Sequence, residues 1–249
     1  MKVSVCTDMI YSDIATPEAM EKIKAAGADA VEFWGAGNKD LNAIAEAGKK
    51  LGLPVAVFCA PGGSMIAPDS STKYPETLKT GVSAADILGC RSLISCSGAP
   101  DWGWSPSEML MRLRETVIAS VPVLEENNLT MLLEPLNASE MSFLRSSGMA
   151  FDLCRMSHTK NVKVLFDLYH MQYMEGNLIN TIRANLDLIG HFHVADLPNR
   201  TAPGLGEINF KNIFKAIKDG GYEGYVGLEY KPGSDRESEL ASVIERIKE

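Results

Sequence analysis

The 249-residue sequence contains no long hydrophobic run: its apolar stretches are the length of strands, too short for a helix that crosses a membrane. It also lacks a signal-peptide architecture, because the first residues enter an alternating strand pattern at once. Low-complexity segments and proline- or serine-rich linkers are absent as well. We therefore expect no membrane partner and a single domain over residues 1–249.

Paired cysteines and excess positive charge are also missing. The five cysteines are odd in number, scattered and never spaced as Cys-x-x-Cys, which argues against a disulfide framework or a structural zinc site. It favours a reducing, cytoplasmic setting. The formal net charge of −8 argues against a nucleic-acid partner, which would need a basic face. The sequence leaves open whether the chain forms a homo-oligomer.

Strand-sized apolar runs alternate with amphipathic helical patterns along the whole chain. Such alternation implies parallel strands joined by right-handed helical crossovers. Eight units favour a closed α/β fold, a single (β/α)8 TIM barrel, over an open doubly wound sheet. The open sheet would carry a glycine-rich turn after the first strand, where this chain has Cys6-Thr7-Asp8-Met9. The predicted strands are residues 3–6, 30–33, 54–58, 92–96, 130–134, 162–167, 190–194 and 225–229.

The connections after the predicted strands tend to be long and chemically rich, whereas those before the strands are short. The long ones are residues 35–40, 59–74, 97–106, 136–149 and 195–207. In a (β/α)8 barrel the active site is built from the loops that follow the strands. The unequal loop lengths therefore predict which end of the barrel carries the function.

Four polar residues stand at the ends of consecutive late strands: Glu134, Asp167, His193 and Glu229. An isolated charge at the end of an apolar strand is costly unless it is paired or bound to a metal. Because barrel strands direct their ends toward a common axis, we expect these side chains to converge. Three carboxylates and one imidazole suit Mg²⁺, Mn²⁺ or Co²⁺ better than a thiolate-preferring metal. The sequence predicts one divalent cation here, although each residue taken alone could instead cap a helix or bond a loop.

Two further residues on this face could bind substrate, and one histidine is ambiguous. His170 could form a hydrogen bond with a substrate oxygen beside the metal or fix the loop after the sixth strand. Arg200 could bind a substrate carboxylate or hydroxyl pair in bidentate fashion, or form a surface salt bridge; Lys231 is a weaker candidate. His191 shares the strand face of His193, so periodicity cannot separate them, but the later residue lies nearer the functional face.

The second predicted strand and the tryptophans add residues that could contact the substrate or line its pocket. Glu32 ends that strand and could bond a loop, a ligand water or the substrate. Trp34, Trp102 and Trp104 fall in loops on the functional face. We expect them to wall the pocket or to pack the loops.

Several segments resemble the xylose-isomerase-like barrel superfamily and, within it, the hydroxypyruvate isomerase family. The resemblance implies that Glu134, Asp167, His193 and Glu229 bind the metal and that Glu134 and Glu229 are the acid/base pair. It further implies that His170 contacts the substrate and that Arg200 is the loop arginine. The matching segments, which span nearly the whole chain, are Val-Glu-Phe-Trp (31–34), Leu-Leu-Glu-Pro-Leu-Asn (132–137), Phe-Asp-Leu-Tyr-His-Met-Gln-Tyr-Met-Glu-Gly-Asn-Leu (166–178), Gly-Glu-Ile-Asn-Phe (206–210) and Gly-Leu-Glu-Tyr-Lys-Pro (227–232).

The resemblance implies a metal-dependent isomerase that converts hydroxypyruvate to tartronate semialdehyde through an enediolate. Two features depart from that family: His193 stands where glutamine is often found, and residues 58–63 lack an expected asparagine. Histidine at this position is commoner among ketose 3-epimerases and sugar isomerases, which are the alternative. An abasic-site endonuclease is a remote alternative, because it would need more metal ligands and a basic groove. A non-catalytic binding barrel is disfavoured by the complete acid pair.

Overall fold

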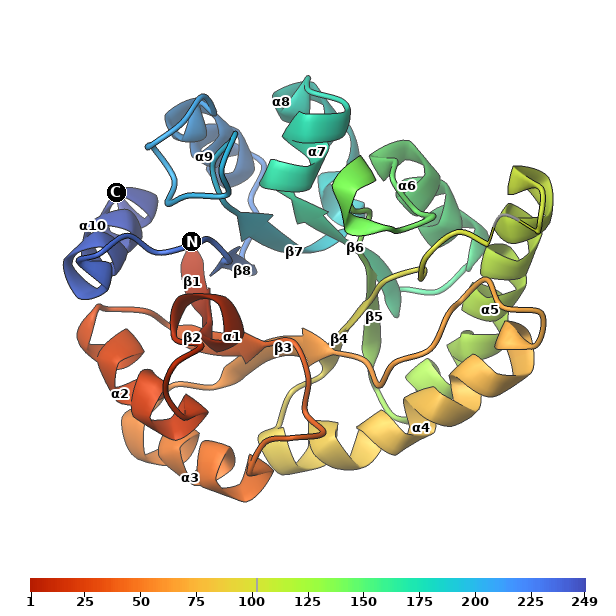
Figure 1. The fold of residues 1–249 in the computed structure, drawn as a ribbon, viewed down its shortest axis with the longest axis horizontal. Coiled ribbons are helices and arrows are strands. Elements are labelled where there is room, and N and C mark those ends of the chain that lie inside the picture. The colour runs from red at the N-terminus through yellow and green to blue at the C-terminus, as the bar shows by residue number, and fades with distance from the viewer. Residues whose placement is uncertain (102) are drawn as a thin grey trace.

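The computed structural model describes residues 1–101 and 103–249, which form a closed barrel of parallel strands (Figure 1). Each strand pairs with its neighbour in chain order, and β1 closes the barrel by pairing with β8. The predicted (β/α)8 TIM barrel is confirmed, and each strand begins and ends within one residue of its predicted bounds. The strands are β1 Lys2–Cys6, β2 Ala30–Phe33, β3 Val55–Cys59, β4 Ser92–Ser95, β5 Thr130–Leu133, β6 Val162–Asp167, β7 Ile189–Val194 and β8 Tyr225–Leu228.

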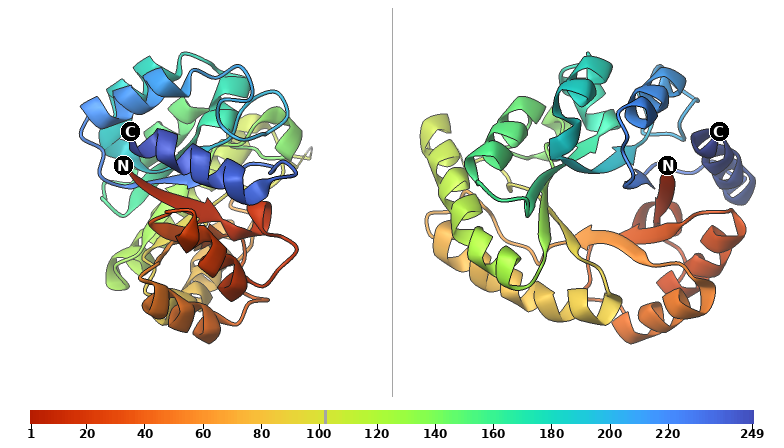
Figure 2. Two further views of the ribbon diagram at one scale, coloured as in Figure 1. Left: turned by 90° about the vertical axis from the view of Figure 1, so that its left-hand side faces the viewer. Right: turned by 180° about the vertical axis from the view of Figure 1, so that it is seen from behind.

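The helices surround the barrel as an outer ring, and the two chain termini lie close together in every view (Figures 1 and 2). The C-terminal helix is tied to the loop before β2, because Lys248 donates to the Gly27 carbonyl and to Asp29. The helices are α1 Thr7–Ile10, α2 Thr16–Ala25, α3 Leu41–Leu51, α4 Ser70–Leu88, α5 Pro106–Glu126, α6 Ser147–Met156, α7 Leu168–Met174, α8 Leu178–Asn185, α9 Phe210–Asp219 and α10 Arg236–Lys248, with short 3-10 helices η1 Ala138–Glu140 and η2 Leu186–Leu188.

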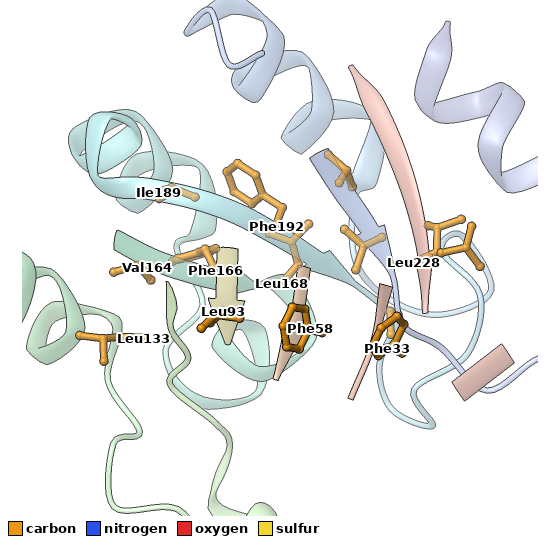
Figure 3. Packing of buried hydrophobic residues seen from close by; sticks show 14 of the residues in the cluster. Phe33, Phe58, Leu93, Leu133, Val164, Phe166, Leu168, Ile189, Phe192 and Leu228 are labelled. Carbon is orange, nitrogen blue, oxygen red and sulfur yellow. The ribbon is translucent and has the colours of Figure 1, made fainter. Parts of the chain in front are cut away.

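Alternation along the strands divides the core into two layers. Residues such as Phe166 of β6 and Phe192 of β7 face outward and pack together at 6.1 Å between ring centroids, within the large cluster between strands and helices (Figure 3). Burying each such ring contributes roughly 1.5–3 kcal/mol. A smaller cluster fills the inside of the barrel: Val57, Ile94, Leu132 and Leu165. Because side chains alternate, the outward phenylalanines leave the neighbouring Asp167 and His193 on the inside.

Most of the loops after the strands are long, as the sequence predicts, although β1 and β6 lead directly into α1 and α7. β3 ends at Cys59 and α4 begins only at Ser70, whereas α3 ends at Leu51 and β3 begins at Val55. The carboxyl ends of the strands and their long loops form one mouth of the barrel, the end where (β/α)8 enzymes carry their active sites.

Candidate active site

Glu134, Asp167, His193 and Glu229 converge at the mouth of the barrel. Each offers one ligand atom, these four atoms lie within 4.8 Å of one another, and all four residues are buried. Asp167 and His193 are facing partners in the β6–β7 pair, and Glu134 and Glu229 follow the last residues of β5 and β8. The predicted four-residue cluster is therefore assembled by the ends of four adjacent strands.

The His193 ring indicates what the cluster could hold. Its Nδ1 atom lies 3.6 Å from Glu134 Oε1 and 3.4 Å from Glu229 Oε2, yet it has no hydrogen-bond partner among the described residues. A buried imidazole nitrogen that faces carboxylates without bonding to them fits a cation placed between them. Three carboxylates and one imidazole are the ligands that Mg²⁺, Mn²⁺ and Co²⁺ accept.

The electrostatics of the cluster also favour a cation. Burial alone would lower the pKa of His193, but the carboxylates of Glu32, Glu229 and Glu134 raise it well above its ordinary value. Burial alone would raise the pKa of Glu229, but the positive charges of His193 and Arg200 outweigh it and hold the pKa at about 2. The lowered pKa keeps Glu229 ionised, so this carboxylate can offer a negative charge to a cation.

Asp167 begins α7 and faces the cluster at the same time. Its Oδ1 atom accepts the backbone N–H groups of Tyr169 at 2.7 Å and His170 at 3.4 Å, which leaves Oδ2 free to face inward. The buried His170 ring places Nε2 3.4 Å from that Oδ2, while its Nδ1 accepts the Asn137 N–H at 3.3 Å. Because Nδ1 is an acceptor, Nε2 carries the proton, so His170 presents a donor beside the cluster.

Arg200 lies over the mouth with its guanidinium directed at the carboxylates. Its Nη2 pairs with Glu229 Oε2 and lies 3.7 Å from Asp167 Oδ2, and its Nη1 donates to Glu140 Oε1 at 3.3 Å. The guanidinium also lies over the Tyr169 ring, 5.2 Å from its centroid. The structure therefore brings the predicted loop arginine to the predicted ligands and adds Glu140, a contact not predicted from the sequence.

The loop that carries Arg200 is organised by a fully buried carboxylate, Asp196. Its two oxygens accept the backbone N–H groups of Gly204 and Gly206 at 2.9 Å and of Ile208 at 3.0 Å. A side chain at Gly206 would collide with the Leu197 carbonyl, 1.8 Å from the position of its Cβ. Asp196 was not predicted from the sequence; the available signal was an acid at the start of a loop that contains two glycines.

Three tryptophans are predicted to line the pocket or to pack the loops. Among the described residues, Trp34 is the one of them whose indole contacts the ligand cluster. Its Nε1–H donates to Glu229 Oε1 at 2.5 Å, and the side chain is 43% exposed, so it stands at the entrance. Trp104 instead packs against α5, with Arg112 4.0 Å above its ring. Trp102 lies outside the described residues. Trp34 and Arg200 together bind both oxygens of Glu229 and fix its orientation.

Glu32 lies below the cluster, and its side chain is buried inside the barrel. It is 1% exposed and contacts Ser4 and both histidines of β7. Lys231, the weaker candidate for substrate binding, donates its backbone N–H to the Arg200 carbonyl at 2.7 Å.

No helix among the described residues combines the length and apolar character that a membrane crossing requires.

Comparison with known proteins places the chain among isomerases. The family described as xylose isomerase-like TIM barrel matches residues 20–249. Hydroxypyruvate isomerase of Escherichia coli (strain K12) is 29% identical over 250 residues, covering 96% of this chain and 97% of the relative. A Mus musculus protein named "Putative hydroxypyruvate isomerase" is 30% identical over 235 residues (88% and 85%), and 2-oxo-tetronate isomerase of Cupriavidus necator is 27% identical over 237 residues (90% of each).

Solved structures share the same architecture. A crystal structure of AP endonuclease, family 2 from Brucella melitensis has a TM-score of 0.91 and 26% identity, covering 98% of this chain and 99% of that one. D-psicose 3-epimerase with D-tagatose from Clostridium cellulolyticum H10 has a TM-score of 0.83 and 18% identity, covering 100% and 98%. The second likeness shows the fold alone. By its family match and its relatives, the chain belongs to the xylose isomerase-like TIM barrel family and, within it, to the hydroxypyruvate isomerase family.

Proposed function

We propose that this chain is a divalent-metal-dependent isomerase that interconverts hydroxypyruvate and tartronate semialdehyde. The observation that carries the proposal is the buried convergence of Glu134, Asp167, His193 and Glu229. The Nδ1 atom of His193 faces this group and has no hydrogen-bond partner in the described part of the chain. Relatives named hydroxypyruvate isomerase support the substrate, and the relative named 2-oxo-tetronate isomerase supports a small carbonyl compound in general.

Glu134, Asp167, His193 and Glu229 would hold one cation, with Mg²⁺ or Mn²⁺ the first choices and Co²⁺ a further one. When bound there, the cation is a Lewis acid that stabilises negative charge developing on substrate oxygens, a contribution of several kcal/mol. The protein side chains supply the proton transfers and the orientation of the substrate.

The reaction is a proton shift between neighbouring carbons. A carboxylate, Glu134 or Glu229, removes a proton from the hydroxyl-bearing C3 of hydroxypyruvate, and the released electron pair forms the C2–C3 double bond of an enediolate. Return of a proton to C2, together with transfer of a hydroxyl proton from O3 to O2, gives tartronate semialdehyde. A positioned carboxylate contributes about 10²–10⁴-fold to such a step.

The remaining residues of the mouth would orient the substrate. His170 presents its Nε2–H beside Asp167 and would donate to a substrate oxygen. Arg200 carries the planar fork that suits the substrate carboxylate, and its buried Nε has no hydrogen-bond partner among the described residues. Trp34 would close the entrance and exclude water.

Metal removal and reconstitution test this function. Protein stripped with a chelator should lose hydroxypyruvate isomerase activity and regain it with Mn²⁺ or Mg²⁺. Full activity in metal-free protein would contradict the role of the cation. Two other activities are measured with the same samples: 3-epimerisation of ketoses, which His193 favours, and cleavage of abasic-site DNA. Cleavage of DNA with no isomerase activity would replace the proposal.

A further inference from the structure

A buried polar layer lies directly below the candidate metal site, where Glu32 of β2 meets both histidines of β7. Glu32 Oε2 is 2.9 Å from His191 Nε2, and Glu32 Oε1 is 2.9 Å from His193 Nε2. Ser4 of β1 also donates its hydroxyl to Oε2 at 2.7 Å. These four residues are no more than 3% exposed, so the carboxylate is held in place by buried contacts with three neighbours.

Glu32 can reach β7 only because β8 carries a glycine between them. Gly227 faces both Ser4 of β1 and His193 of β7 in the strand register. A Cβ at Gly227 would lie 2.5 Å from Glu32 Oε1 and 2.8 Å from His191 Nε2. Real Cβ atoms do not approach this closely, so the missing side chain leaves the space that the carboxylate fills.

We propose that Glu32 is a positioning residue, which acts on the metal site through His193. It holds Nε2 of the ring toward itself, which turns Nδ1 toward Glu134 and Glu229. His191 and Ser4 occupy Oε2 and thereby fix the carboxylate with Oε1 available to His193. A ligating histidine that shares its second N–H with a carboxylate keeps one tautomer and is a better metal ligand.

The contact between His193 and Glu32 is close but not aligned. Neither His193 Nε2 nor Glu32 Oε1 has a well-directed hydrogen bond within the described part of the chain. The two atoms are nevertheless 2.9 Å apart, within hydrogen-bond distance. Glu32, His191 and His193 could also each offer a ligand atom to a second ion, so the number of ions bound per chain is part of the test.

The inference rests on the proposed metal site, and metal binding by the protein alone tests it. Metal-free wild type, Glu32→Gln and Gly227→Ala are titrated with Mn²⁺ by calorimetry. Gln keeps the volume of Glu32 but not its charge, whereas the added methyl group displaces the carboxylate and leaves its charge intact. Both variants should bind Mn²⁺ about 10–100-fold more weakly than wild type. Gly62→Ala, with nothing within 4 Å of its Cβ, is the matched control and should bind as wild type does.

A spectroscopic measurement separates positioning from a general structural role. The Co²⁺-loaded wild type should show a hyperfine-shifted, slowly exchanging N–H resonance from His193 Nε2, in addition to any from His170 Nε2. In Glu32→Gln this resonance should disappear, or its proton should exchange with solvent much faster. Thermal unfolding of the metal-free variants should remain cooperative. Ser4→Ala, a milder change, serves if the other two variants fail to fold, and it should weaken Mn²⁺ binding by a smaller factor.

The outcomes are distinguishable. Wild-type affinity together with an unchanged N–H resonance in folded Glu32→Gln, or in Ser4→Ala if only that variant folds, would overturn the positioning role and leave the proposed function intact. Two metal ions per wild-type chain would overturn it in favour of a second site. A wild-type protein that binds no metal would remove both proposals.

Discussion

Arg200 Nη2 pairs directly with Glu229 Oε2, which joins the loop after β7 to the carboxylate at the end of β8. The same guanidinium reaches Glu140 and lies over Tyr169, so it is held from three sides. This arrangement places a cationic fork at the point where a substrate carboxylate would enter, next to the group we propose as an acid or base.

Arg200→Lys should therefore act mainly on substrate binding. Lysine keeps the charge but loses the planar pair of donors, so we expect KM for hydroxypyruvate to rise about 10–100-fold, equivalent to roughly 1.5–3 kcal/mol, with a much smaller change in kcat. Steady-state kinetics measures both constants. Arg145→Lys, in the loop after β5, is the control and should leave both unchanged. A drop confined to kcat would place Arg200 in the chemical step instead.

Glu229→Gln should act on the chemistry. The amide still offers an oxygen to the Trp34 N–H but cannot accept the substrate proton, so kcat should fall at least 100-fold, about 3 kcal/mol. Glu134→Gln should give a loss of similar size. Deuterium uptake at carbon, followed by NMR in D₂O, shows whether proton abstraction itself has stopped. The control is Glu175→Gln, a carboxylate that bonds Ser147 away from the ligand cluster; a near-normal kcat for Glu229→Gln would remove it from the mechanism.

The four proposed ligands were predictable from sequence because regular geometry brings them together. Asp167 and His193 lie at the ends of strands whose outward phenylalanines fix which side chains face inward. In a closed parallel barrel, inward-facing residues at adjacent strand ends lie close together. Periodicity left His191 and His193 equivalent, and the structure separates them: only His193 belongs to the group with Glu134, Asp167 and Glu229.

The remaining contacts depend on features that periodicity does not encode. Glu32 reaches β7 across β1 and β8 because Gly227 leaves room for its carboxylate. A single glycine in a strand does not indicate from sequence that it makes such room. Arg200 has a left-handed backbone (φ 58°) in an irregular loop, so its direction follows from the hydrogen bonds of Asp196 and not from a repeating pattern. Such loop and cross-barrel contacts need the folded chain.

Metal binding should also stabilise the fold through the same ligands. Mn²⁺ at about 100 times its Kd contributes roughly 2.7 kcal/mol, which corresponds to a rise in Tm of roughly 5–10 °C for a chain of this size. His193→Ala should abolish most of that rise, and differential scanning calorimetry with and without the ion measures it. His158→Ala, in the turn after α6, should keep the full shift. An undiminished shift in His193→Ala would exclude this histidine as a ligand.

Asp196→Asn should loosen the loop that carries Arg200. An amide cannot accept on both atoms, so at least one of the three backbone N–H groups bound by Asp196 loses its partner, at a cost of about 1–3 kcal/mol. We expect kcat/KM to fall tenfold or more and hydrogen exchange to accelerate within residues 197–208. Asp152→Asn, an exposed acid on α6 paired with Arg155, is the control. Unchanged exchange in this loop would show that Asp196 does not organise it.

The choice of substrate is tested by comparing the turnover of one charged compound with the turnover of neutral sugars. If Arg200 binds a carboxylate, hydroxypyruvate should be turned over well, and D-tagatose, D-psicose and L-ribulose poorly. Arg200→Met sharpens the comparison, because it removes the cation while keeping an unbranched side chain. Its kcat/KM for hydroxypyruvate should fall by at least tenfold more than its kcat/KM for any neutral ketose, since only the acid loses an ion pair. Turnover of the ketoses without turnover of hydroxypyruvate would favour the 3-epimerase alternative. The histidine at position 193 would then indicate which substrate the protein prefers, in addition to its proposed role as a metal ligand.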